Sequence, residues 1–151
     1  MHLNHKNIMK KILIATLIVI ANTSFAQIKD SITTDKNAND TLKLQVLYFH
    51  ITNRCHTCIS IESEIRKTLL ENYKGKIDNG MIRFASINVE DSAYLWLANK
   101  YETGGASLFL TKYTKGKEGQ KEDMTSWAFQ KIHSTEDFDK ELEEKINEFL
   151  K

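Results

Sequence analysis

Proline is absent from the 151-residue sequence, whereas an average chain of this length contains about seven. A cis peptide bond that does not precede proline costs about 2.5 to 4 kcal/mol, so no cis bond is expected. An excess of charge of one sign is also lacking, because 21 lysines and arginines stand against 20 aspartates and glutamates. This balance gives no reason to expect nucleic acid or an anionic membrane surface as a partner.

Cysteine is nearly as scarce as proline. The two cysteines, Cys55 and Cys58, are too few to staple a small scaffold of disulfides. A bridge between such close neighbours would also remove little conformational entropy from the unfolded chain. A purely structural disulfide is therefore a poor explanation of the pair.

The N-terminal residues 1–26 have the pattern of a secretory signal peptide. Two lysines precede the apolar run 12–21, which is too short to span a bilayer comfortably, and small residues close the segment. We expect cleavage between Ala26 and Gln27 and a periplasmic or secreted protein that is free of the membrane afterwards. The remaining chain is long enough for one domain, with a monomer as the default.

The rest of the chain divides into a polar leader and a domain. Residues 27–41 have no hydrophobic period, which predicts a flexible leader. Hydrophobic periodicity in residues 42–151 predicts an α/β domain. The expected elements are a strand over 43–50, a helix from 58 to about 73, a strand over 81–89, a helix over 90–101, a hairpin of strands 106–113 and 124–129, and a final helix that starts near 134.

A Cys-x-x-Cys motif at the junction of the first strand and the first helix makes residues 42–151 resemble the thioredoxin family. Residues 46–58 are similar to the family's active-site strand and loop. The segment similar to the one that faces the active site from the next strand is Gly105, Ala106 and Ser107. The resemblance implies a three-layer α/β sandwich in which helices flank a central mixed sheet.

Three positions depart from the family pattern. Ala106 stands where family members usually carry a cis-proline, and Arg54 stands where a tryptophan often precedes the first cysteine. Phe49 replaces the buried acid of the first strand, which helps proton transfer in many reductases. These changes favour a specialised redox protein over a general-purpose thioredoxin.

Thiol-disulfide exchange is the chemistry that the motif favours. A helix N-terminus lowers the pKa of a thiol from about 8.5, and the cations of Arg54 and protonated His56 would act in the same direction. His50, at the end of the first strand, is a third candidate for tuning the pair. We predict that Cys55 is the exposed nucleophile and Cys58 the buried resolving thiol. Protein clients and a redox partner that resets the pair are implied, with no cofactor besides the Cys55–Cys58 disulfide.

Two other functions remain open from the sequence. The two thiolates, with a nitrogen from His50 or His56, would suit Cu(I) or Zn. In the family the cis-proline blocks such ligation, so Ala106 makes metal binding less remote. A non-catalytic binding module that retains the fold is the other alternative. The direction of a redox reaction (oxidation, isomerisation or reduction of clients) is also open.

Overall fold

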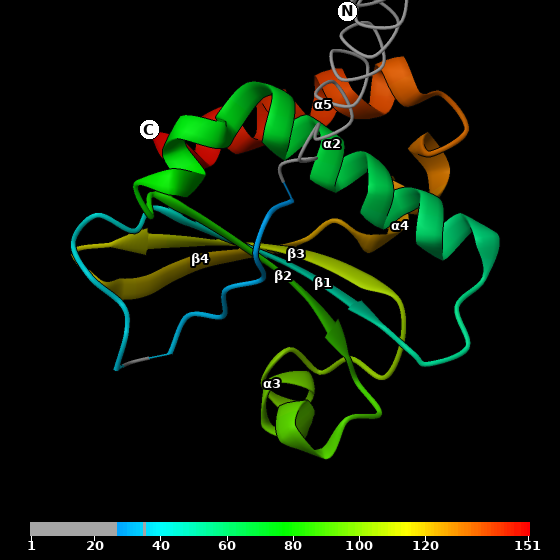
Figure 1. The fold of residues 1–151 in the computed structure, drawn as a ribbon, viewed down its shortest axis with the longest axis horizontal. Coiled ribbons are helices and arrows are strands. Elements are labelled where there is room, and N and C mark those ends of the chain that lie inside the picture. Colours follow the sequence, from blue (N-terminus) through cyan, green and yellow to red (C-terminus); the bar gives the residue numbers. More distant parts are fainter. Residues whose placement is uncertain (1–26, 35) are drawn as a thin grey trace, which may run out of the picture.

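The structure, a computed structural model, describes residues 27–34 and 36–151 (Figure 1). The predicted signal peptide, residues 1–26, lies outside the described residues. Within the described ranges, no helix combines the length and the apolar character that crossing a membrane requires.

The described chain forms one sheet with helices on both of its faces (Figure 1). In chain order the elements are β1 (Leu44–His50), α2 (His56–Asp78), β2 (Ile82–Asn88), the 3-10 turn η1 (Ser92–Tyr94), α3 (Leu95–Lys100), β3 (Ser107–Thr114), β4 (Lys117–Asp123), α4 (Thr125–Lys131) and α5 (Thr135–Leu150). The strand order is β2-β1-β3-β4, with β1 parallel to β2 and the other two pairs antiparallel. Helices α2, α4 and α5 cover one face and α3 the other, which confirms the predicted three-layer α/β sandwich.

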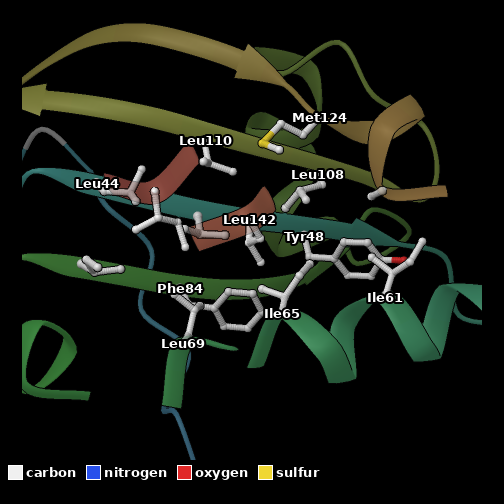
Figure 2. Close-up of a cluster of buried hydrophobic side chains, with 14 of the residues drawn as sticks. Leu44, Tyr48, Ile61, Ile65, Leu69, Phe84, Leu108, Leu110, Met124 and Leu142 are labelled. Carbon is white, nitrogen blue, oxygen red and sulfur yellow. The ribbon is translucent and has the colours of Figure 1, made fainter. Parts of the chain in front are cut away.

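Two hydrophobic clusters, one on each face of the sheet, explain why most side chains of β1 are apolar. Successive side chains of a strand point to opposite faces. Leu44, Val46 and Tyr48 therefore enter the larger cluster, against α2 and α5, while Leu47 and Phe49 enter the smaller one, beneath α3. Figure 2 shows the larger cluster, in which side chains of α2 and α5 meet those of the strands. This central strand delivers the Cys-x-x-Cys motif from a rigid position.

The second strand of the hairpin lies earlier in the chain than predicted. β4 is joined to β3 by a two-residue turn, Lys115 and Gly116, both with positive φ (51° and 71°). Such a turn matches the twist of the strands, and glycine adopts positive φ without a steric penalty. The expected strand 124–129 was wrong, because most of that segment forms α4. Periodicity missed β4 because this edge strand is charged and mostly exposed.

The segment predicted as a flexible leader packs against the sheet, so that prediction does not fit the structure. Ile28 belongs to the larger hydrophobic cluster. The backbone N–H of Ser31 donates to the carbonyl of Phe84 at the edge of β2 (2.7 Å). Thr33 donates to the side-chain carbonyl of Gln45 from its backbone N–H (2.9 Å) and its hydroxyl (2.5 Å). Most of these contacts are hydrogen bonds. Because hydrogen-bonded residues need not be hydrophobic, the sequence of this segment shows no hydrophobic period, and its packing was not predicted.

Replacing Gln45 with leucine is expected to destabilise the protein by about 2 to 3 kcal/mol, because it leaves buried polar groups of the N-terminal segment without partners. Gln45 is 1% exposed and bonds to Thr33 and to the carbonyl of Ser31. Urea denaturation followed by circular dichroism measures the loss. An unchanged midpoint would show that the segment adds nothing to stability.

Candidate active site

The disulfide between Cys55 and Cys58 lies at the N-terminus of α2. In Figure 1 a short loop leads from the carboxyl end of β1 into this helix. Cys55 caps the helix: its Sγ accepts a hydrogen bond from the backbone N–H of Cys58 at 3.1 Å. The two Cα atoms are 5.2 Å apart. Cys55 is exposed and Cys58 half-buried. A thiolate at Cys55 would therefore meet both solvent and a backbone N–H of the first helical turn.

The first turn of α2 is tied to β1 through the backbone carbonyl of Cys58. This oxygen accepts hydrogen bonds from the hydroxyl of Tyr48 (2.9 Å) and from Nη2 of Arg54 (3.3 Å). The Arg54 guanidinium also lies 5.7 Å from the centroid of the Tyr48 ring. Burial raises the pKa of the Tyr48 hydroxyl above 10.0, so it stays protonated and able to donate near neutral pH. Tyr48 was not predicted as a residue of the site.

Glu62 is the acid of this site, and sequence analysis missed it. Its Oε2 forms an ion pair with Arg54 at 2.6 Å and accepts a hydrogen bond from the Ser86 hydroxyl at 2.8 Å. Its Oε1 pairs with Arg66 at 2.7 Å. Burial favours a raised pKa for this carboxyl, but the hydrogen bonds from Arg66 and Ser86 and the charge of Arg54 outweigh it and hold the pKa below 4.5. Glu62 follows Cys58 by four residues, and this same-face helical spacing was the available signal.

Arg54, His56 and His50 were predicted to tune the pKa of the cysteine thiols, and the structure places each of them in a different environment. Arg54 is engaged by Glu62, rather than a free cation beside Cys55. His50 is half-buried, with its Nδ1 2.9 Å from the carbonyl of Ile51. His56 is exposed as the first residue of α2 and lines a small surface pocket together with His133. Their influence on the thiols stays a prediction.

The described residues bring together no group of three or more histidine, cysteine, aspartate or glutamate side chains that could hold a metal ion. The geometry therefore supplies no ligand set beyond the two thiols and the histidines that the sequence had suggested. It gives no reason to prefer metal binding over redox chemistry.

No family model matches the sequence, and no curated protein matches it. Similar solved structures include the Trx4 domain of ERdj5 (16% identity over 72% of this chain and 92% of that one, TM-score 0.48). Another is a thioredoxin of Fasciola hepatica (18% identity over 65% of this chain and 84% of that one, TM-score 0.40). A third is oxidised thioredoxin O2 of Arabidopsis thaliana (16% identity over 59% of this chain and 70% of that one, TM-score 0.40).

The strand order, the strand directions and the helix that begins at the Cys-x-x-Cys motif together decide the architecture. The fold is thioredoxin-like. In this thioredoxin-like fold the Cys55–Cys58 disulfide lies at a strand-to-helix junction, with Cys55 exposed and Cys58 half-buried.

The segment expected to face the disulfide lies at the correct end of this thioredoxin-like sheet. Ser107 begins β3 and pairs with Phe49 near the end of β1, and its hydroxyl hydrogen-bonds that of Thr103 at 2.6 Å. Gly105 and Ala106 directly precede it along the chain. The described residues contain no cis peptide bond, as expected for a chain without proline. The facing role of these three residues stays a prediction.

Phe49 lies in an aromatic cluster on the face of the sheet that α3 covers. Its ring is fully buried, with its centroid 5.4 Å from that of Tyr101 and 5.9 Å from that of Phe109. Burial raises the pKa of Tyr101 to about 12. The position that the resemblance assigns to a buried acid therefore holds an apolar ring, on the face of the sheet opposite to α2.

Proposed function

We propose that the protein is an exported thiol-disulfide oxidoreductase that exchanges disulfides with protein clients through Cys55 and Cys58. One observation carries the proposal: Cys55 is an exposed residue whose Sγ caps the 23-residue helix α2 and accepts a hydrogen bond from the backbone N–H of Cys58. A helix N-terminus favours negative charge, so this position stabilises the thiolate that attacks disulfides.

The reaction needs no cofactor besides the cysteine pair. In the reduced protein the Cys55 thiolate attacks a client disulfide, forms a mixed disulfide and releases one client thiolate, which takes up a proton. Cys58, after loss of its proton to solvent, then attacks Cys55 Sγ and releases the second client thiolate. The client gains two electrons and the protein regains its disulfide. The reverse sequence oxidises a client dithiol, and a separate redox partner resets the pair in either direction.

Protein clients fit the surface around the disulfide. Ile51 and Ile59 flank the motif along the chain, and these large apolar side chains are 37% and 51% exposed. Such side chains favour contact with apolar segments of an unfolded or flexible polypeptide. We infer that the protein acts as a monomer, without nucleic acid or membrane, in the periplasm or outside the cell. The signal-peptide pattern before Gln27 supports that location.

Alkylation of the reduced protein tests the activated thiolate. We expect the rate of iodoacetamide modification at Cys55 to rise with pH with a midpoint below 8.5, because the helix N-terminus stabilises the thiolate. Mass spectrometry of the modified peptide assigns the site. A midpoint at or above that of a free cysteine would refute activation at this position.

Equilibration with glutathione tests the function itself and supplies its direction. A pair that cycles with a potential near −270 mV, the range of cytosolic reductases, indicates reduction of clients, whereas a much higher value indicates disulfide donation. A disulfide that cannot be reduced and re-formed in the folded protein would instead favour a non-catalytic binding module.

A further inference from the structure

Four charged side chains form a continuous chain from the residue before Cys55 to the N-terminal segment. Arg54 pairs with Glu62 at 2.6 Å, Glu62 with Arg66 at 2.7 Å, and Arg66 with Asp30 at 2.8 Å. Positive and negative groups alternate along it, so each charge is compensated by a neighbour. Glu62 is the most deeply placed member, with a side chain 12% exposed.

Arg54 depends on this chain for its position. Its Nη2 contacts both Glu62 Oε2 and the carbonyl of Cys58. Its Nε, by contrast, is buried without a hydrogen-bond partner. A partly buried guanidinium with an unsatisfied donor is costly, so its ion pair is what compensates for the burial. Without Glu62, the guanidinium would be free to leave the Cys58 carbonyl and to turn toward the sulfur of the adjacent Cys55.

We propose that Glu62 is a positioning residue for the cysteine pair: it holds Arg54 against the first turn of α2 and cancels the effect of the Arg54 charge on Cys55. The inference rests on the proposed oxidoreductase function. Arg66 lies between Glu62 and Asp30, so the N-terminal segment belongs to the same arrangement.

This arrangement of charges would determine the equilibrium between the Cys55–Cys58 disulfide and the reduced cysteine pair. A cation near a thiol lowers its pKa, and a nearby anion opposes that effect. While Glu62 is charged, the cation of Arg54 contributes little to the thiolate. Removing the carboxylate leaves Arg54 uncompensated, stabilises the thiolate and therefore the reduced protein, and makes the disulfide a stronger oxidant.

The test measures one equilibrium in several variants. The Cys55–Cys58 disulfide and two reduced glutathione molecules give the dithiol and one glutathione disulfide, and trapping with acid and alkylation gives the constant. Glu62→Gln is expected to raise this constant about three- to tenfold and to lower the alkylation midpoint of Cys55. Arg54→Gln is expected to change the constant less than twofold, because the charge that it removes is already compensated and Glu62 stays paired with Arg66. Glu71→Gln, which removes the same charge from an exposed position of α2, is the control and should leave it unchanged.

The double variant separates positioning from a direct effect. Glu62→Gln changes the logarithm of the equilibrium constant by a certain amount in the wild type. In the Arg54→Gln background, the same substitution should change it by less than half of that amount. Equal effects in both backgrounds would overturn the proposal, since Glu62 would then act without Arg54. An equal effect of Glu71→Gln would also overturn it, because overall charge would be the cause.

Failure of this inference can be told from failure of the proposed function. A wild-type pair that does not cycle with glutathione overturns both. A wild-type pair that cycles, with Glu62→Gln indistinguishable from it, overturns the role of Glu62 alone. If Glu62→Gln does not fold, Glu62→Asp takes its place, because a carboxylate one methylene shorter loosens the contact with Arg54. A higher constant then supports the proposal, and an unchanged constant refutes it.

Discussion

Replacing Cys58 with serine is expected to stop turnover and trap a stable mixed disulfide on Cys55. The Cys55 thiolate still attacks, but no second thiol is present to resolve the adduct. With the aromatic disulfide 5,5′-dithiobis(2-nitrobenzoate), the reduced wild type should release about two equivalents of thionitrobenzoate and retain none. Cys58→Ser should release about one and retain one, which absorbance and intact-protein mass spectrometry measure together.

Cys55→Ser is the matched control for these roles. The remaining thiol, Cys58, is half-buried and its backbone N–H points to residue 55, so the reaction should be much slower than in Cys58→Ser. The opposite pattern, with fast adduct formation in Cys55→Ser and a slow reaction in Cys58→Ser, would contradict the assignment of nucleophile and resolving thiol.

Phe138→Ala is expected to cause the largest loss of stability, about 3 to 5 kcal/mol, because it removes a fully buried ring and leaves a cavity. Phe138 lies on α5 with its centroid 4.8 Å from that of the Trp127 ring on α4. The ring thus joins two helices of the layer that supports α2. Urea denaturation followed by circular dichroism measures the change in the free energy of unfolding.

Trp96→Ala provides a control of larger volume at the surface. The Trp96 side chain is 48% exposed on α3, and its removal should change stability by about 0.5 kcal/mol or less. Equal losses in the two variants would show that burial in this structure does not identify the stabilising contacts.

The sequence predicted those elements whose side chains carry a clear period. The first strand was expected over 43–50 and is Leu44–His50, because both of its faces are buried and residues 46–49 are continuously apolar. The final helix was found from its apolar face and acidic first turn. β4 was missed because an edge strand with exposed faces needs no apolar residues. The fixed N-terminal segment was missed because a distant side chain, Gln45, holds it.

The candidate site was only partly predictable for a similar reason. Cys55 and Cys58 are local in sequence, so their spacing and the start of a helix were sufficient to identify them. The contact of Tyr48 with the Cys58 carbonyl depends on the packing of α2 against β1. The surroundings of Glu62 likewise depend on β2, which brings Ser86 to it. A helical pattern identifies the face that a residue occupies but not the partners that tertiary packing brings there.

The covered edge of β2 has a consequence for how the protein meets unfolded chains. At this edge the backbone N–H of Ser31 donates a hydrogen bond to the carbonyl of Phe84. The Asp30 carboxylate accepts a hydrogen bond from the backbone N–H of Ser86 (3.3 Å). The opposite edge, β4, is lined with lysines and glutamates that disfavour addition of a further strand. An extended client therefore finds poor templates for β-augmentation on this sheet. For the protein clients that we propose, contact would then be confined to the disulfide and its apolar neighbours, and a client would leave once exchange is complete.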